Sequence, residues 1–107
     1  MCRTALAIVL ALLVFASPAF ALPRPAHYQA LLCIHHYEGS WTDGGAPYYG
    51  GLQMDWSFMS TYGHWLLVHK GTANHWTPLE QMRVAERAIH SRGFWPWPNT
   101  ARICGLL

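Results

Sequence analysis

Two cysteines, Cys33 and Cys104, constrain the fold of this chain more than any other feature, because they stand near opposite ends of the segment that can fold. A segment as short as residues 22–107 builds a hydrophobic core that is only marginally stable alone. Small exported domains therefore commonly add a disulfide. A bond between the two cysteines would close a loop of about 70 residues and stabilise the fold by about 4 kcal/mol on the chain-entropy model. We expect this bond to form, with two buried free thiols as the alternative.

The N-terminal segment predicts the export that such a bond requires. Arg3 provides a positive start, residues 5–16 are apolar, and Ala19-Phe20-Ala21 offers small residues at the positions that a signal peptidase reads. We expect residues 1–21 to be a signal peptide and residues 22–107 to be a single secreted domain, with no membrane attachment after cleavage. The uncharged run also leaves an uncleaved membrane anchor as an alternative.

Local signals predict a small, mainly α-helical domain of the α+β type. Apolar periodicity, helix caps and glycine stops indicate helices at 26–37, 56–62, 64–70 and 78–92. Between the first two, residues 40–51 are rich in glycine and tyrosine, which indicates an irregular loop or a short hairpin. We find no internal repeat and no sign of a second domain.

The clearest local signal is Thr77-Pro78-Leu79-Glu80, which combines a capping box with proline at the first helical position. Apolar residues recur at helical spacing after it, so we expect one buried and one exposed face. The buried face would hold Leu79, Met82, Ala85, Ala88 and Ile89. The exposed face would hold Glu80, Arg83, Glu86, Arg87 and His90.

Charge and aromatic content narrow the classes of partner. Without Arg3, six basic and five acidic residues remain, with no cluster of lysine and arginine, so we expect no nucleic-acid partner. All six tryptophans and all five tyrosines lie in the expected mature domain. This suits a carbohydrate ligand, although core packing is the alternative role for each tryptophan. The seven histidines lack metal-binding spacing, so we expect neither a metal nor a cofactor.

Glu38 is the candidate catalyst. It stands at the end of the first expected helix, beside a loop rich in glycine, tyrosine and tryptophan that closes with Gly50-Gly51-Leu52-Gln53-Met54. A carboxylic acid in such surroundings is the kind of group that donates a proton to a sugar oxygen. The alternative is a surface carboxylate that ends a helix and has no chemical role.

Four segments, flanked by two cysteines, then occur in a fixed order: Cys33, Glu38-Gly39-Ser40-Trp41, Tyr48-Tyr49-Gly50-Gly51-Leu52-Gln53-Met54, Glu80-Gln81-Met82-Arg83-Val84-Ala85-Glu86-Arg87, Trp97-Pro98 and Cys104. The series resembles the transglycosylase-like domain of resuscitation-promoting factors, which are secreted actinobacterial proteins that act on peptidoglycan. The resemblance spans roughly residues 28–104. It implies a small lysozyme-like fold in which Glu38 is the catalytic acid and Cys33 pairs with Cys104.

The chain departs from this family at two places. The family's glutamate usually follows its cysteine directly, whereas residues 34–37 intervene here. The family also tends to have Asn/Thr-Gly-Asn-Gly before the two tyrosines, whereas this chain has Thr42-Asp43-Gly44-Gly45-Ala46-Pro47.

The expected reaction is cleavage of the bond between N-acetylmuramic acid and N-acetylglucosamine, with glycan contacts from Trp41, Tyr49, Gly50, Gly51 and Gln53. The two glycines could instead serve a tight turn. A hydrolase normally uses a second carboxylate, and only Asp43 and Asp55 are close in sequence, Asp55 being equally explained as a helix cap. We therefore expect a lytic route, in which the muramic acid 6-hydroxyl closes a 1,6-anhydro ring. Hydrolysis with a held water is the alternative.

The expected partner is the glycan strand of peptidoglycan, and other cell-wall hydrolases are candidate protein partners. We expect a monomer that acts outside the cell or in the cell wall. A second hypothesis belongs to a different class of function: a catalytically inactive secreted module of the same fold that binds peptidoglycan or a partner protein.

Overall fold

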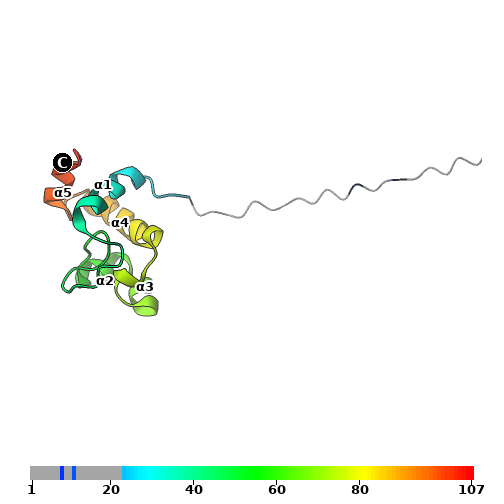
Figure 1. Cartoon of the computed structure of the whole chain (residues 1–107), viewed down its shortest axis with the longest axis horizontal. Coiled ribbons are helices and arrows are strands. Elements are labelled where there is room, and N and C mark those ends of the chain that lie inside the picture. Colours follow the sequence, from blue (N-terminus) through cyan, green and yellow to red (C-terminus); the bar gives the residue numbers. More distant parts are fainter. Residues whose placement is uncertain (1–7, 9–10, 12–22) are drawn as a thin grey trace, which may run out of the picture.

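The computed structural model describes residues 8, 11 and 23–107, and the rest of the expected signal peptide lies outside the described residues. The described chain forms α1 (Tyr28–Glu38), α2 (Trp56–Tyr62), α3 (His64–Lys70), a 3-10 turn η1 (Ala73–His75), α4 (Pro78–Arg92) and α5 (Pro98–Ile103), as Figure 1 shows. Among these elements, no helix is long and apolar enough to cross a membrane.

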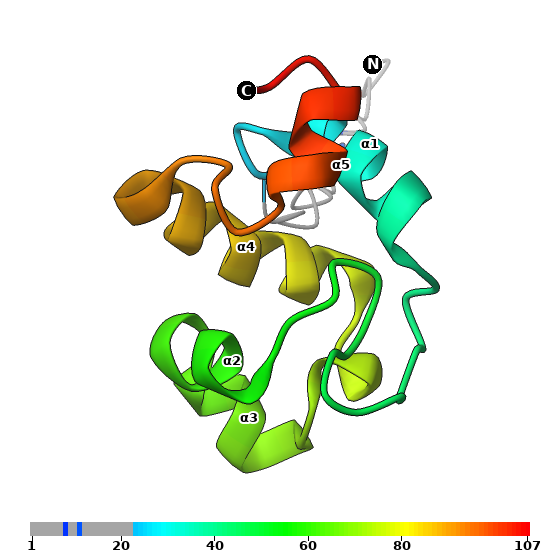
Figure 2. The same ribbon diagram turned by 90° about the vertical axis from the view of Figure 1, so that its left-hand side faces the viewer.

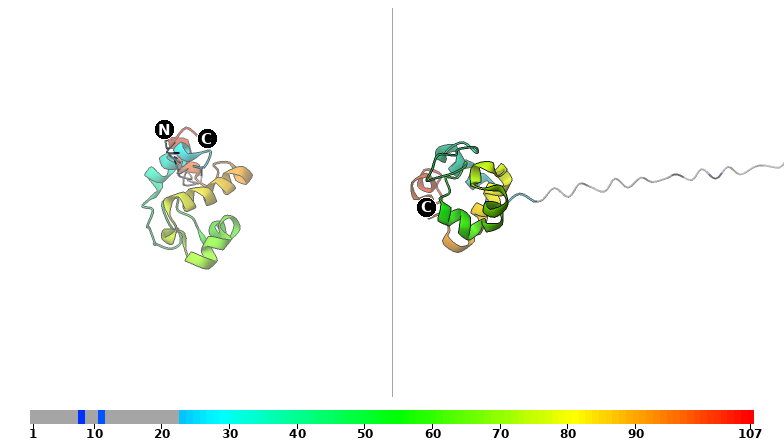
Figure 3. Two further views of the ribbon diagram at one scale, coloured as in Figure 1. Left: turned by 90° about the vertical axis from the view of Figure 1, so that its right-hand side faces the viewer. Right: turned by 90° about the horizontal axis from the view of Figure 1, so that it is seen from below.

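Helix α4 is the central element. It lies between two pairs of helices, with α1 and α5 on one side and α2 and α3 on the other (Figure 2). The two further views in Figure 3 agree with this arrangement. The first and last helices of the domain are therefore neighbours, and the long loop after α1 runs along the side of the molecule to reach α2.

The helices predicted from local signals are confirmed. The first begins two residues later than expected and includes Glu38 as its last residue. Asp55 caps α2 by accepting a hydrogen bond from the backbone N–H of Phe58, 2.8 Å away. The capping box of α4 is complete: the hydroxyl of Thr77 accepts from the backbone N–H of Glu80, and the carboxylate of Glu80 accepts from that of Thr77. Helix α5, which starts at Pro98, was not predicted.

The buried face of α4 is wider than predicted. It holds Gln81, Met82, Val84, Ala85, Ala88 and Ile89. Gln81 and Val84 are fully buried, whereas Leu79 is 37% exposed, so the expectation for Leu79 is wrong. The physical reason is that α4 packs against helices on two sides, which buries more than one stripe of a helix.

The loop after α1 contains one β-bridge, between Tyr49 and Met54, whose backbone N–H and C=O groups bond each other at 2.9 Å. The rest of the loop is irregular, and the described part of the chain contains no strand. The expected β contribution to the fold is therefore reduced to this single bridge. The turn between the bridged residues places Gly50 and Gln53 at positive φ, 74° and 51°.

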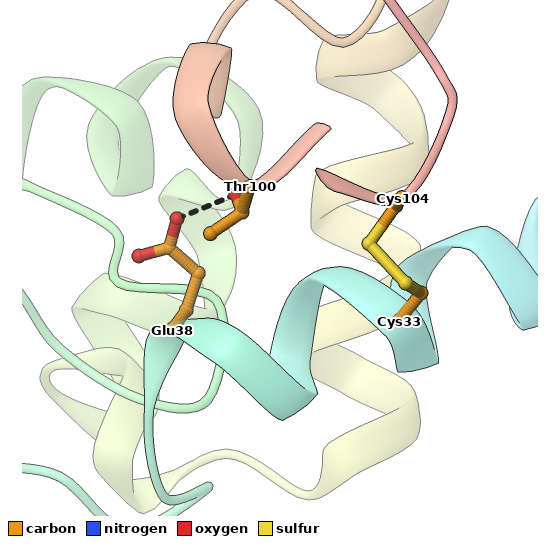
Figure 4. Close-up of a disulfide and its surroundings, with 4 residues drawn as sticks. All are labelled: Cys33, Glu38, Thr100 and Cys104. Carbon is orange, nitrogen blue, oxygen red and sulfur yellow. Dashed lines mark hydrogen bonds between the residues drawn. A yellow bond between two sulfur atoms is a disulfide. The ribbon is translucent and has the colours of Figure 1, made fainter. Parts of the chain in front are cut away.

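The predicted disulfide is confirmed. Cys33 of α1 is bonded to Cys104, which follows α5, and the bond joins residues 71 positions apart. Figure 4 shows the bond between the two helices, with Glu38 further along α1. The domain is thus small and mainly helical, with its two ends covalently joined.

Candidate active site

Glu38 is held by a residue from the far end of the chain. Its Oε1 atom accepts a hydrogen bond from the hydroxyl of Thr100, 2.8 Å away (Figure 4). Thr100 is only 9% exposed and belongs to α5. The hydrogen bond from Thr100 holds the carboxyl group of Glu38 directly. The Cys33–Cys104 disulfide also ties α1, which carries Glu38, to the end of α5.

Glu38 opens onto a groove built from two adjoining cavities. The first, of about 210 Å³, is lined by Glu38, Tyr48, Gln53, Pro96, Trp97, Pro98 and Asn99. The second, of about 170 Å³, is lined by Tyr48, Gln53, Asp55, Phe58, Arg92, Pro96 and Trp97. The two cavities adjoin, because both are lined by Tyr48, Gln53, Pro96 and Trp97. We call them together the Glu38 groove.

The lining of the Glu38 groove combines aromatic side chains and prolines with polar groups. Trp97 is 3% exposed, and its indole N–H donates to the carbonyl of Leu52 at 2.7 Å. Tyr48 is 49% exposed and stands at the junction of the two cavities. Aromatic surface beside polar groups suits a sugar, whose ring faces are apolar and whose hydroxyl groups form hydrogen bonds.

Gln53 is brought into the groove as predicted, on a strained backbone. Its φ of 51° lies in the left-handed region, which residues other than glycine rarely adopt. Its side-chain Nε2 donates to Asp43 Oδ2 at 2.8 Å and to the carbonyl of Gly50 at 2.9 Å. The amide is therefore held rigidly between the loop and the groove.

The two candidate second carboxylates have different partners. Asp43 Oδ1 accepts from the backbone N–H of Gly45 at 3.0 Å, and Oδ2 accepts from Gln53. The Gly45 N–H and the Gln53 amide together lower the pKa of Asp43 below its ordinary value. Asp55 caps α2 and lines the half of the groove away from Glu38. Among the described residues that line the other half, Glu38 is the one carboxylate.

The structure does not bring the other expected glycan contacts into the groove. Gly50 and Gly51 are buried, and an added Cβ would overlap Gln81 at Gly50 and Trp41 at Gly51. Trp41 is half-buried and stacks on the His35 ring with centroids 3.8 Å apart. Tyr49 is also half-buried and packs against the core. The loop glycines therefore serve internal packing.

Sequence reasoning missed several groove residues. The two adjacent tyrosines, Tyr48 and Tyr49, carried a usable signal, because neighbours in extended chain point to opposite sides; the outward one is Tyr48. Trp97 was noted only as part of the resemblance. Nothing near Thr100 in the sequence indicates that its hydroxyl would meet Glu38, because the two are 62 residues apart.

A larger cavity lies between α3 and α4. It has a volume of about 300 Å³ and is lined by Gly63, Trp65, Leu66, Glu80, Arg83, Val84 and Arg87. Its one carboxylate, Glu80, is already committed to the capping box and to Lys70, 2.9 Å away. We therefore place the candidate chemistry in the Glu38 groove, although each of its two cavities is smaller.

The described residues contain no group of three or more histidine, cysteine, aspartate or glutamate side chains that could hold a metal ion. No protein-family model matches the chain, and no curated protein shows significant similarity to it. A functional assignment therefore depends on the groove itself and on the sequence resemblance.

Proposed function

We propose that this protein is a secreted enzyme that cleaves peptidoglycan, with a lysozyme-like fold related to the resuscitation-promoting factors and with Glu38 as its acid catalyst. The observation that carries the proposal is the position of Glu38. It is the one carboxylate among the described residues of a groove half that is otherwise lined by Tyr48, Trp97, two prolines, Gln53 and Asn99. An acid beside aromatic and polar groups that can hold a sugar matches the needs of glycosidic bond cleavage.

The hydrogen bond from Thr100 assigns the two oxygens of Glu38 to different tasks. Oε1 accepts the Thr100 hydroxyl, so Oε2 is the oxygen that carries the proton toward the glycosidic oxygen. Proton transfer breaks the bond between that oxygen and the anomeric carbon of N-acetylmuramic acid, as oxocarbenium character develops on the ring. The resulting Glu38 carboxylate can then accept a proton from the attacking hydroxyl group.

The state of the other carboxylates supports a lytic outcome. Both oxygens of Asp43 already accept hydrogen bonds, and Asp55 caps α2 in the distant half of the groove. We infer that neither is the second carboxyl group that a hydrolase normally uses. In the route we propose, the 6-hydroxyl of the muramic acid attacks the anomeric carbon, gives its proton to Glu38 and closes a 1,6-anhydro ring.

One observation favours the second candidate function, a binding module without catalysis. The Thr100 bond gives Glu38 a structural role between α1 and α5, so its presence does not by itself require chemistry. Such a module would use the same groove and walls to hold a glycan strand without cleaving it.

The test is Glu38→Gln, which keeps the shape of the side chain and the Thr100 contact but cannot donate a proton. We expect glycan cleavage to fall by about 10²–10⁴-fold with binding to peptidoglycan retained. The readout is mass analysis of the fragments released from peptidoglycan. Glu86→Gln is the matched control, because Glu86 bonds His27 outside the groove. Release at the parent rate by the Glu38 variant would rule out Glu38 as the acid catalyst, whereas no release by the parent protein would leave only the binding module.

The chemical route is tested by reaction in water enriched in oxygen-18. A lytic product gains no heavy oxygen, because the attacking oxygen comes from the sugar itself. Hydrolysis would place one heavy oxygen at each new reducing end. Stoichiometric label would mean that Glu38 activates a water, and the lytic route would then be wrong even though the enzyme assignment stands.

A further inference from the structure

The orientation of the Gln53 amide is fixed by its partners. Its nitrogen lies 2.8 Å from Asp43 Oδ2 and 2.9 Å from the carbonyl oxygen of Gly50. An ionised carboxylate and a backbone carbonyl can only accept hydrogen bonds, so the atom that faces both must be the donor. The alternative amide orientation would put an oxygen against two oxygens. Both N–H bonds of Gln53 are thus used inside the protein.

The remaining atom, Oε1 of Gln53, is the one available to a ligand. No described residue donates to it, and no buried side-chain nitrogen or oxygen in the described part of the chain lacks a partner. The oxygen must therefore reach solvent, and Gln53 lines both halves of the Glu38 groove. We infer that this oxygen is the acceptor that Gln53 offers to a ligand in the groove, and the ligand must then bring a donor.

Asp43 and Gln53 also pack against the turn that carries Glu38. An added Cβ on Gly39, the next residue after Glu38, would lie 3.1 Å from Gln53 Nε2 and 3.5 Å from Asp43 Oδ2. The carbonyl of Asp43 accepts the backbone N–H of Gly50 at 2.7 Å, which joins the loop to the strained turn. These contacts hold Gln53, and with it the acceptor oxygen, in a fixed position relative to the turn that carries Glu38.

We propose that Asp43 is a positioning residue, which holds the Gln53 amide so that Oε1 accepts the N–H of an N-acetyl group on the sugar beside the scissile bond. This inference rests on the proposed function and names the feature of the substrate that the groove reads. It gives Asp43 a task other than nucleophile or base. Asp43 also stands in the segment 42–47, where the chain departs from the resuscitation-promoting factors.

The proposal predicts a selectivity that a simple binding assay can measure. The probes are chitotetraose and its ester isostere, in which each N-acetyl N–H is replaced by an oxygen. Protein carrying Glu38→Gln keeps both probes intact. We expect it to bind the amide probe about tenfold more tightly than the ester, the value of one hydrogen bond. Equal affinity, or no binding of either probe, would overturn the proposal.

The role of Asp43 is tested by Asp43→Asn in the same background. An asparagine cannot accept from both Gly45 and Gln53, so the amide is released and the tenfold preference should disappear. In protein that also carries Gln53→Met, adding Asp43→Asn should change the ratio no further, because Asp43 acts through Gln53. Glu86→Gln is the matched control, because Glu86 lies outside the groove, and it should keep the preference. A preference that survives Asp43→Asn would refute the positioning role.

A spectroscopic measurement on the unaltered protein covers the case in which Asp43→Asn fails to fold. The Nε2 protons of Gln53 should be protected from exchange, and their chemical shifts should follow the titration of the Asp43 carboxyl group. If these protons exchange freely and their chemical shifts do not change as Asp43 titrates, Asp43 does not hold the Gln53 amide and the proposal is wrong. This inference and the proposed function can fail separately. Cleavage without selectivity for the amide probe would contradict this inference alone. Selectivity without cleavage would contradict the proposed enzyme activity alone.

Discussion

Thr100 gives the candidate site its most informative contact at the scale of single residues. Its hydroxyl donates to a carboxyl group on another helix, and little of the side chain is exposed. A hydrogen bond to such a group contributes more when it is shielded from water. The contact is therefore compatible with two roles for Glu38. It can serve the packing of α1 against α5, and it would also keep a catalytic proton donor in one orientation.

Thr100→Val tests this contact, because valine keeps the shape of threonine and removes only the hydroxyl. We expect kcat to fall about tenfold while KM changes little, since the acid loses its orientation and the groove walls are untouched. The free energy of unfolding should fall by about 1–2 kcal/mol. Steady-state kinetics on peptidoglycan fragments and urea unfolding measure the two effects. An unchanged kcat would mean that the contact only stabilises the fold.

Gln81 shows why residue-scale sequence reasoning fails at some positions. It is fully buried, accepts the N–H of Gly51 at 2.8 Å, and donates to the carbonyls of Trp41 and Trp76. A polar residue on a helix is expected to face water. Here it satisfies backbone groups of a loop that packs across α4, and that loop's path is not visible in local sequence.

At the scale of elements, the helix termini were the most predictable part of the fold. Asp55, Thr77 and Glu80 use side-chain oxygens to satisfy nearby backbone N–H groups, so their signals lie within a few residues of the structure they create. Helix α5 was not predicted, because residues 95–98 contain two prolines and proline usually interrupts a helix. Pro98 instead occupies the first turn, where its missing N–H costs nothing.

The cap of α4 makes a prediction about pH. Partial burial raises the pKa of Glu80, but the Thr77 backbone N–H and Lys70 outweigh this effect and lower the pKa below its ordinary value. A carboxyl group with a lowered pKa stabilises the fold above its unfolded-state pKa, and this contribution is lost as the pH falls through the folded-state pKa. The ionised Glu80 should therefore stabilise the protein at neutral pH and not in strong acid.

Glu80→Gln isolates that charge, because glutamine can still complete the capping box. The variant should be less stable than the parent at neutral pH, and the gap should close as the pH falls below the usual range of a glutamate. Urea unfolding midpoints at several pH values measure it. A gap that stays constant with pH would show that Glu80 stabilises α4 through geometry and not through charge.

At the scale of the whole molecule, the groove depends on how the two ends of the chain meet. Glu38 comes from α1, Gln53 from the bridged loop, and Trp97 from the segment before α5. Sequence reasoning reached Glu38 and Gln53 because both stand in recognisable motifs. It could not reach Trp97 or Thr100, because these residues lie beside Glu38 only once α5 packs against α1.

The disulfide is the whole-molecule feature most open to measurement. Replacing Cys33 and Cys104 together by serine should lower the free energy of unfolding by about 2–5 kcal/mol. It should also lower catalytic activity near the melting range, since α5 would loosen first against α1. Thermal unfolding with and without reductant measures the effect, and the double serine variant should not respond to reductant. Equal melting temperatures for parent and variant would contradict this role.

A groove whose parts come from both ends of the chain also depends on the order of synthesis. The ribosome makes Glu38 long before Thr100, which follows 62 residues later. Until then the nascent chain carries an acid without the hydroxyl that orients it and without the Trp97 wall. Once the chain is complete, the bond between Cys104 and Cys33 changes the outcome of a cut. A protease that cleaved the chain between α4 and α5 would leave α5 attached to α1.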